Sequence, residues 1–349
     1  METAGKNRLC LKAQQEAQEQ WDHVAKPLHS LGLLEDLIVK IAGIQETADV
    51  RVEKRCALVF CGDHGVVAEG VTQSGSEVTA LVAGSIAQGN ANINLMAAVS
   101  GTDVFAVDMG MASDVPGTIG RRIARGTQNM ARGPAMSRAQ AEAAVRAGAQ
   151  LVGEMKEKGY RIIATGEMGI GNTTASTAMA CALLHMEPDA LTGRGAGLSD
   201  AGLVRKRAAI ESALRINRPD PDDPLDVLSK VGGFEIAGMT GAFLGGMAYR
   251  VPIIIDGVIS AVAALTAARI CPAARDFMLP SHMSREKAAA CIMEELSLRP
   301  IVQADMALGE GTGAVTLLPL LDMALRVYRG THTFDDLGME AYTPQGGNA

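Results

Sequence analysis

The sequence predicts an α/β protein built on a parallel sheet with flanking helices. The central part of the 349-residue chain alternates short β-branched runs with longer Ala-rich segments, which is the pattern of βαβ units. Several of the β-branched runs end in Gly or Asp. Hydrophobic residues make up 48% of the chain and charged residues 20%, so the chain can bury a large core and is too apolar to be disordered.

The β-branched runs and the Ala-rich segments define the expected elements. Strands are predicted at Ala57–Cys61, Asp103–Asp108, Arg161–Thr165, Pro252–Asp256 and Asp276–Leu279. One helix is expected from Ser137 to about Lys158, because Ser137 and Gln140 form a capping-box signature and Gly159 is placed to end the helix. Further helices are expected near Glu77–Ala87, Thr173–Leu184, Asp200–Arg215, Glu235–Tyr249, Ile259–Arg269 and Arg285–Leu296.

The chain shows no internal repeat and no long linker. We expect residues 1–50 to form a helical segment that is interrupted at Lys26-Pro27. Residues 51–285 are expected to form a large α/β domain with the parallel sheet, and residues 286–349 a C-terminal helical segment that carries the loop around Glu310. Within that last segment, residues 330–349 are typical of a loose or partner-docking tail.

Composition and charge exclude several functions. The net charge of −7 argues against a nucleic-acid binder, and an aromatic content of 3% argues against a base-stacking platform. The six cysteines form no C-x-x-C pair, so no zinc-finger or ferredoxin spacing is present. The N-terminal stretch lacks the apolar core of a signal peptide, and the most apolar stretch, Gly257 to Ala268, is too short to cross a bilayer. We therefore expect a cytoplasmic protein with no membrane partner and no metal.

The segment that follows the predicted strand at 161–165 is the most informative for function. It has the sequence GEMGIGNTT (166–174) and leads directly into a predicted helix. Glycines let backbone N–H groups approach an anion, and Thr173 and Thr174 add hydroxyl donors, so a phosphate is the expected ligand. The order of glycines matches neither a dinucleotide fingerprint nor a P-loop, which favours a mononucleotide. The alternative is that the turn only packs tightly.

Other polar residues are weaker candidates. A second glycine loop, GRGAGL (193–198), precedes a helix whose Lys206 is either a counter-charge for the phosphate or part of a solvated face. Asp63-His64 is more typical of a loop-shaping pair than of a metal site, and His282, which follows a predicted strand, is either a ligand contact or structural. Cys56 and Cys61 are expected in the core.

Glu310 is the strongest catalytic candidate. The segment LGEGTGA (308–314) holds this carboxylate between two glycines, just before an apolar helix. Flanking glycines leave Glu310 free to face a pocket, where burial favours use as a general base. Helix capping by Glu310 or Thr312 is the comparable alternative.

Taken together, these segments resemble the nicotinate-nucleotide:dimethylbenzimidazole phosphoribosyltransferase family, which activates the lower-ligand base of cobalamin. The resemblance covers most of the chain and rests on several motifs in family order: GDHGVVAEGV (62–71), NINLMA (92–97), GTQNMARGPAMS (126–137), GEMGIGNTTAS (166–176), GRGAGLSDAGLVRK (193–206), GGFEIAGMTGAFLGG (232–246), IIIDGVIS (253–260) and LGEGTGA (308–314). It implies a doubly wound parallel α/β domain plus a small helical domain formed by the chain ends. It also implies a homodimer without metal or redox cofactor.

The resemblance also implies an activity and its residues. Phosphoribose passes from nicotinate mononucleotide to a benzimidazole nitrogen, with release of nicotinate and formation of an α-ribazole phosphate, and the catalytic base matches Glu310. The residues matched to phosphate, ribose and nicotinate are Glu167, Gly169, Ile170, Gly171, Asn172, Thr173, Thr174, Gly195, Gly197, Lys206 and Ser284. The residues matched to the acceptor-base pocket are Thr72, Ser74, Ser76 and Leu308.

The chain departs from the family pattern at several places. Ser74-Gly75-Ser76 stands where members carry an aromatic residue, Pro and Gln, Ala307 replaces an Arg, and a Gly-His pair expected soon after Ser284 is missing. These changes predict an altered acceptor, either another benzimidazole, a purine or a phenol. A weakly active, nucleotide-binding subunit of a heterodimer with a homologous chain is the alternative function. A nicotinamide-cofactor oxidoreductase is disfavoured, because no G-x-G-x-x-G follows a predicted strand.

Overall fold

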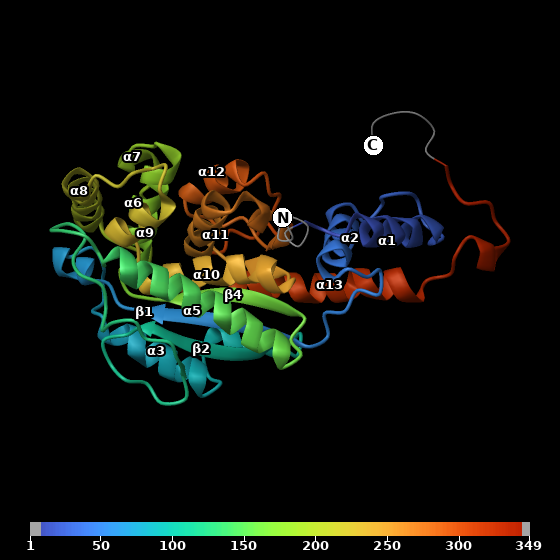
Figure 1. Cartoon of the computed structure of the whole chain (residues 1–349), viewed down its shortest axis with the longest axis horizontal. Coiled ribbons are helices and arrows are strands. Elements are labelled where there is room, and N and C mark those ends of the chain that lie inside the picture. Colours follow the sequence, from blue (N-terminus) through green and yellow to red (C-terminus); the bar gives the residue numbers. More distant parts are fainter. Residues whose placement is uncertain (1–7, 344–349) are drawn as a thin grey trace.

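The computed structural model describes residues 8–343, so residues 1–7 and 344–349 of the predicted end segments lie outside the described residues. Its strands form one parallel sheet with the order β3-β2-β1-β4-β5-β6 (Figure 1). The strands are β1 Arg55–Gly62, β2 Asp103–Gly110, β3 Ile119–Gly120, β4 Ile162–Met168, β5 Ile253–Ile255 and β6 Met278–Pro280. The predicted fold class is confirmed.

Both faces of the sheet are covered by helices, as β1 shows most clearly. All eight residues of β1 are buried. Cys56, Leu58 and Phe60 belong to the hydrophobic cluster on one face, which is formed with α5, α6, α10 and α11. Ala57, Val59 and Cys61 belong to the cluster on the other face, with α3, α4 and α13. A strand buried on both faces has to be apolar along its whole length, which is why the run at 57–61 predicts a strand without alternation.

The helices have the following bounds: α1 Leu11–His23, α2 Leu33–Gln45, α3 Glu77–Ala87, α4 Asn92–Ala98, α5 Arg138–Glu157, α6 Asn172–Leu184, α7 Pro188–Leu191, α8 Asp200–Asn217, α9 Pro224–Val231, α10 Phe234–Tyr249, α11 Val258–Ile270, α12 Ala288–Glu295 and α13 Thr312–Gly330. Short 3₁₀ segments lie at η1 Gly65–Glu69, η2 Pro272–Phe277 and η3 Asp335–Leu337. The expected capping box of α5 is present, because Ser137 and Gln140 satisfy each other's backbone N–H groups.

The sequence prediction was wrong or incomplete at several short elements. The last predicted strand, Asp276–Leu279, begins two residues later, because Asp276 and Phe277 belong to η2 behind Pro272. Strand β3 and the helices α4, α7 and α9 were not predicted, because they are too short to establish a hydrophobic period.

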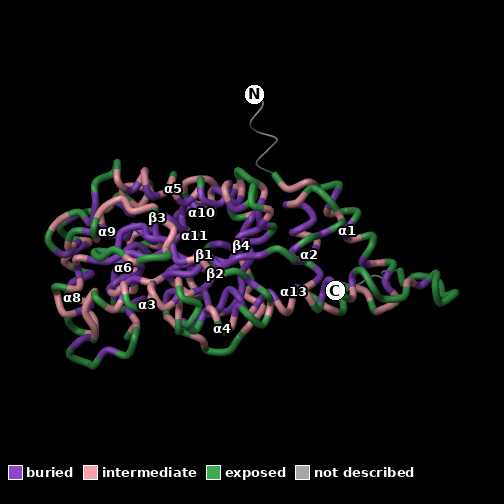
Figure 2. Tube along the Cα trace, turned by 90° about the horizontal axis from the view of Figure 1, so that it is seen from below, coloured by how far each residue is buried: buried purple, intermediate pink, exposed green. Residues whose placement is uncertain are grey.

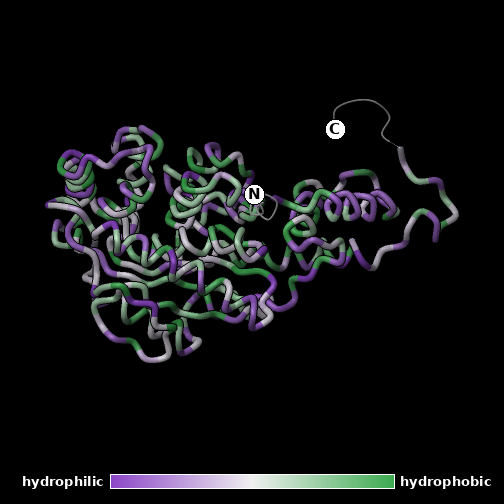
Figure 3. Tube along the Cα trace, viewed as in Figure 1, coloured by the Kyte–Doolittle hydropathy of each residue, from purple (hydrophilic) through white to green (hydrophobic). Residues whose placement is uncertain are grey.

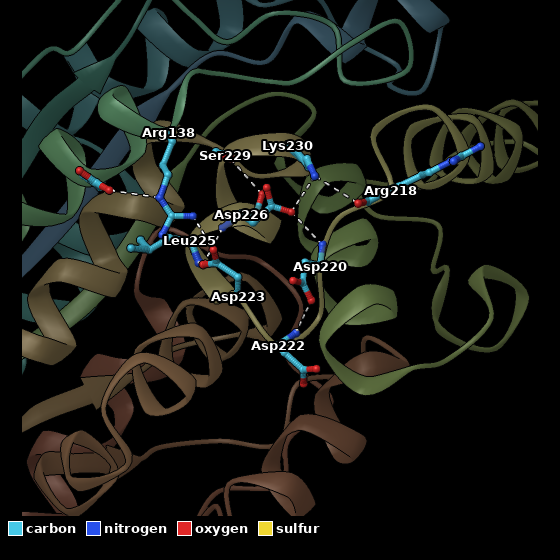
Figure 4. A network of polar contacts seen from close by, with 10 residues as sticks. Arg138, Arg218, Asp220, Asp222, Asp223, Leu225, Asp226, Ser229 and Lys230 are labelled. Atoms are coloured by element: carbon cyan, nitrogen blue, oxygen red, sulfur yellow. Dashed lines mark hydrogen bonds and ion pairs between the residues drawn. The ribbon is translucent and has the colours of Figure 1, made fainter.

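Helix α9 buries Val227, Leu228 and Val231 in the core, and acidic residues also fix its position. Asp223 caps it by accepting the N–H groups of Leu225 and Asp226 at 3.1 and 3.2 Å, and Pro224 occupies its first turn. Arg138 of α5 binds Asp223, and Lys230 binds Asp226 one turn further along at 2.8 Å (Figure 4). The acidic run at 220–226 therefore joins α9 to α5.

The two ends of the chain pack together at one end of the sheet. Figure 1 shows α1, α2 and the last turns of α13 projecting beyond the strands. Figure 3 shows α1 as mostly hydrophilic, and its buried residues are limited to Ala13, Ala17 and Trp21. The Trp21 ring lies 5.0 Å from the Tyr328 ring of α13, measured between centroids. Whether residues 1–50 and 286–349 act as a domain separate from 51–285 stays a prediction.

The tail is anchored before it becomes exposed. The backbone N–H of Phe334 donates to His23 O at 3.1 Å, and the Phe334 side chain is buried. Residues 335–343 are exposed, which Figure 2 shows as the green end of the chain beyond α13. The expectation of a loose tail therefore fails at 331–334.

Candidate active site

A cavity of ≈ 260 Å³ opens beyond the carboxyl ends of β4, β5 and β6. Its polar lining includes Glu167 at the end of β4, Asp256 after β5, His282 and Ser284 after β6, and Glu310 before α13. In parallel sheets the ligand site lies at this edge, because the loops that follow the strands converge there. The structure thus brings the two motifs around residues 167 and 310 to one site.

The glycines of the 166–171 segment are required by close backbone contacts. A Cβ atom at Gly169 would lie 2.3 Å from Gly62 O, and a Cβ atom at Gly166 would lie 2.4 Å from Glu310 O. Gly171 precedes α6 with φ 99°, a backbone conformation that other residues rarely adopt. The segment is therefore packed tightly, as the alternative in the sequence analysis states. It also lines the cavity, so tight packing is not its only feature.

The hydroxyl and amide groups of this segment face in different directions. Gly169, Ile170, Asn172 and Thr173 line the cavity, and the Ile170 N–H donates to Thr79 Oγ1 at 3.1 Å. Thr174 is fully buried within α6 and lines neither this cavity nor the smaller one beside it. The structure therefore does not place Thr174 where it would donate to a phosphate.

A smaller cavity of ≈ 80 Å³ adjoins the first and shares its wall of Gly169, Ile170, Asn172, Thr173, Gly195 and Ala196. Lys206 lines this smaller cavity and donates to Thr173 Oγ1 at 2.8 Å. The side chain of Lys206 is almost fully buried, and this burial lowers its pKa to about 8. A buried ammonium beside a glycine loop is suited to an anion. The alternative that Lys206 belongs to a solvated helix face is wrong, because the residue is 1% exposed.

Two loops meet over the smaller cavity. Gln73 of the segment before α3 donates its side-chain N–H to Ala196 O at 3.2 Å and also contacts Gly197 O. Gly197 lines neither cavity, and its carbonyl serves this loop contact. Gly195, in contrast, lines both cavities.

The four residues expected to form an acceptor-base pocket are not brought together. Thr72 and Ser74 line the smaller cavity beside Lys206, whereas Leu308 lines the larger cavity beside Glu310. Ser76 precedes α3 and lines neither of them. Residues 72–74 thus lie against the start of α6 and Lys206, whereas Leu308 lies in the cavity that contains Glu310.

The loop around Glu310 has an unusual backbone that several contacts fix. Gly309, Glu310 and Gly311 have φ values of 91°, 61° and 93°, and this run is strained for the non-glycine residue. The buried Asp256 carboxylate accepts the N–H groups of Gly311 and Ala314 at 3.1 and 2.9 Å. Thr312 Oγ1 donates to Gly309 O at 2.8 Å. Glu310 is therefore presented at the cavity by a rigid turn.

The Glu310 carboxylate itself is held by α4. Asn92 Nδ2 donates to Oε1 at 3.1 Å, and the Ile93 N–H donates to Oε2 at 3.2 Å. Sequence reasoning did not single out Asn92 or Asp256. The signals present were the segment NINLMA and the aspartate that ends the predicted strand at 252–256, but neither spacing reveals a partner more than fifty positions away.

Glu167 is a second carboxyl group in the cavity, with an altered proton affinity. Its pKa is raised from 4.5 to about 8, mainly by burial and also by the nearby carboxylates of Asp256 and Glu235, while the hydrogen bond from Asn172 acts in the opposite direction. The same effect of burial raises the pKa of Asp256, and its neighbour His282 opposes the shift. Such shifts are typical of functional sites.

Asp63 and His64 shape the loop after β1. Asp63 accepts the N–H of Ala112 at 2.8 Å, and His64 Nε2 lies 2.6 Å from Glu235 Oε1, with both side chains of that pair buried. Within residues 8–343 no three His, Cys, Asp or Glu side chains are grouped so that they would hold a metal ion. Among the same residues no helix is both long and apolar enough to cross a membrane.

A doubly wound parallel sheet with a glycine loop, a buried lysine and opposed carboxyl groups at its carboxyl edge defines a nucleotide-binding α/β enzyme. A family model described as phosphoribosyltransferase matches residues 7–339. The chain is 44% identical over 330 residues to the nicotinate-nucleotide–dimethylbenzimidazole phosphoribosyltransferase of Acetivibrio thermocellus, covering 94% of each chain. It is 45% identical over 318 residues to the enzyme of the same name from Syntrophobacter fumaroxidans, covering 90% of each chain.

Solved structures agree with these relatives. The crystal structure of CobT from Thermus thermophilus matches with a TM-score of 0.89 at 37% identity, covering 95% of this chain and 100% of that one. This chain belongs to the nicotinate-nucleotide–dimethylbenzimidazole phosphoribosyltransferase family, and it is a pentosyl-transferring enzyme.

Proposed function

We propose that this protein transfers the 5-phosphoribosyl group of nicotinate mononucleotide to the lower-ligand base of a cobamide, with release of nicotinate. The acceptor is dimethylbenzimidazole or a related benzimidazole, purine or phenol, and the product is an α-ribazole phosphate or its analogue. One observation carries the proposal. Glu310, which precedes α13, and the glycine segment at 169–173, which leads from β4 into α6, line the same cavity. The names and coverage of the relatives support it.

The phosphate of the donor is assigned to the smaller cavity. Lys206 supplies the positive charge, Thr173 a hydroxyl donor, and Gly171 and Gly195 let the backbone approach closely. Because the two cavities share the wall at 169–173, a nucleotide with its phosphate beside Lys206 reaches into the larger cavity with its ribose. Ser284 and Glu167 then lie on the side of the ribose and nicotinate.

The reaction needs one base and no acid at the leaving group. Nicotinate attached through its pyridinium nitrogen is already cationic, so it leaves as a neutral ring nitrogen without protonation. The acceptor nitrogen must lose a proton as it attacks C1′ of the ribose, and we assign Glu310, which lines the larger cavity, to take that proton. Attack opposite the leaving group inverts the anomeric centre from β to α.

Glu167 has a different role from Glu310. With its pKa raised to about 8 by burial, this carboxyl group is mostly protonated at neutral pH and donates a hydrogen bond. A neutral group there avoids adding a negative charge beside Asp256 while the ribose hydroxyls bind. We therefore assign Glu167 to ribose orientation.

The acceptor ring is assigned to the wall beside Glu310. Val82, Met306 and Leu308 line the larger cavity there, and aliphatic side chains of this kind pack against the flat face of a bicyclic ring. Ala307 lies between Met306 and Leu308, so this stretch carries no side-chain charge.

The test is Glu310→Gln. We expect turnover to fall by at least 10²-fold, because the amide does not accept the proton, while nicotinate mononucleotide binds with unchanged affinity by calorimetry. Lys206→Met serves as the matched variant, since it is expected to weaken donor binding instead. Full turnover by Glu310→Gln would overturn the proposal.

The assembly is also a proposal. We propose a homodimer in the cytoplasm, and the purified chain should then sediment as a dimer and be active alone. Activity that appears only after addition of a homologous chain would instead favour the heterodimer alternative.

A further inference from the structure

We propose that Asn92 is a positioning residue for this reaction, which orients the Glu310 carboxylate for proton transfer from the acceptor. This inference rests on the proposed function, because it requires Glu310 to be the base. Asn92 lies on α4, which belongs to a different part of the chain from the loop that carries Glu310.

Two consecutive residues of α4 hold the two carboxylate oxygens separately. Asn92 Nδ2 lies 3.1 Å from Oε1, and the Ile93 backbone nitrogen lies 3.2 Å from Oε2. A carboxylate that is bonded through both oxygens can turn neither about its last side-chain bond nor away from the cavity. One of the two bonds comes from a side chain, so mutation can remove it without altering the backbone.

The contact complements the restraints on the Glu310 backbone. Asp256 fixes the turn through the N–H groups of Gly311 and Ala314, and the Gly166 Cα packs against Glu310 O. None of these three contacts reaches the Glu310 carboxylate, which stands on a flexible side chain that is only half-buried. The direction of the carboxylate is therefore set by α4.

The hydrogen bonds also suit the chemistry of the step. Each carboxylate oxygen has two lone pairs, so the two donors leave lone pairs free for the acceptor's proton. In the step, the acceptor N–H bond breaks and an O–H bond forms on Glu310. The nitrogen electron pair forms the bond to C1′, and the bond from C1′ to the pyridinium nitrogen breaks with its electrons going to nicotinate. The donors stabilise the ionised form that must exist before this transfer.

The same helix offers a matched control. Asn94 is also an asparagine of α4, and its side chain accepts from the Ala91 N–H at 3.1 Å and donates to Ile86 O at 3.2 Å. It makes two structural hydrogen bonds, and neither of them involves Glu310. If Asn92 acted only by supporting α4, Asn94→Ala would harm turnover at least as much as Asn92→Ala.

The experiment compares Asn92→Ala, Asn92→Asp and Asn94→Ala by steady-state kinetics, pH profile and thermal unfolding. For Asn92→Ala we expect kcat to fall about 5- to 20-fold, the range for loss of a partly exposed hydrogen bond to a charged group. The KM for nicotinate mononucleotide should stay within about twofold, and Tm should be unchanged. The acid limb of the kcat profile should move to higher pH, and Asn92→Asp should move it further because of its added negative charge. Asn94→Ala should lower Tm and leave that limb in place.

Repeating the Asn92→Ala change in a Glu310→Gln enzyme shows whether a failure concerns this inference or the proposed function. In a Glu310→Gln background, Asn92→Ala should cause no further loss, because the carboxylate it orients is gone. An Asn92→Ala enzyme with wild-type kcat and pH profile, alongside an inactive Glu310→Gln enzyme, overturns the inference alone. An active Glu310→Gln enzyme overturns the assignment of the base itself.

Discussion

The Asp256 carboxylate accepts the backbone N–H of Gly311 at 3.1 Å, which joins the end of β5 directly to the turn that presents Glu310. The same carboxylate accepts the Ala314 N–H at 2.9 Å and so also caps the first turn of α13. Asp256 is 3% exposed, so these hydrogen bonds are shielded from bulk water in the intact protein. The geometry of the turn that presents Glu310 therefore depends on a buried residue at the edge of the sheet.

We expect Asp256→Ala to lower both stability and turnover. The change leaves two buried N–H groups without acceptors, at a cost of about 1–3 kcal/mol in the free energy of unfolding. The kcat should fall as well, because the turn at 309–311 loses a restraint. Urea unfolding and steady-state kinetics measure the two effects, with Asp276→Ala, at a half-buried position outside the cavity lining, as the control. A stable and fully active Asp256→Ala enzyme would show that Asp256 does not hold the turn.

We expect Lys206→Met to stabilise the folded protein and to weaken the binding of nicotinate mononucleotide. Burial lowers the pKa of Lys206 to about 8, so at pH 7 the folded state holds a charge that the unfolded state solvates better. Replacing it with an apolar side chain should raise the free energy of unfolding at pH 7 by about 1–3 kcal/mol and raise the KM for nicotinate mononucleotide at least tenfold. Lys12→Met, on the exposed face of α1, should change neither quantity.

The way in which Lys206 makes the stability of the wild-type protein depend on pH follows from the same pKa. Between about pH 8 and 10.5 the unfolded state binds more protons at this group than the folded state, so its contribution to stability rises with pH. Binding of the nucleotide donor should weaken as the pH rises, because Lys206 loses its charge above about pH 8. The pH dependence of nucleotide binding by calorimetry checks this, and an affinity independent of pH from 7 to 9.5 would argue against Lys206 as the counter-charge.

Glu167 should contribute a pH dependence of its own. Its pKa is raised from 4.5 to about 8 by burial and neighbouring carboxylates, so the folded state binds more protons there than the unfolded state between these values. Its contribution to stability is complete below pH 4.5 and is lost as the pH rises through 8. Glu167→Gln should therefore flatten the fall of the unfolding free energy between pH 5 and 8, and exposed Glu19→Gln should not. An unchanged slope in Glu167→Gln would contradict the raised pKa.

Acceptor preference should follow the aliphatic wall of the larger cavity. We expect dimethylbenzimidazole to have a higher kcat/KM than adenine or p-cresol, because Val82, Met306 and Leu308 offer no partner for the adenine amino group. A phenol ring also covers less of this wall. A competition assay with all three acceptors measures the order. A preference for adenine or p-cresol would instead support the altered acceptor that the departure from the family pattern at residues 74–76 predicts.

Much of the fold was available from local patterns. The strand at 57–61 is apolar along its length because both its faces are covered, and the capping box at Ser137 fixes the start of α5. Short elements such as α4 and β3 were missed, because seven or two residues do not establish a period. That omission mattered for the site, because α4 supplies Asn92.

The sequence by itself determined the parallel α/β class, the glycine segment at 166–171 and the isolated carboxylate of Glu310, since each depends on residues that are adjacent in the chain. Only the tertiary structure decided which groups act on one another. It placed Thr72 and Ser74 beside Lys206 rather than beside Leu308, and it buried Lys206 and Glu167. The physical reason is that hydrogen bonding, desolvation and charge coupling depend on distance in space, and the groups concerned come from the ends of strands that are far apart in the sequence.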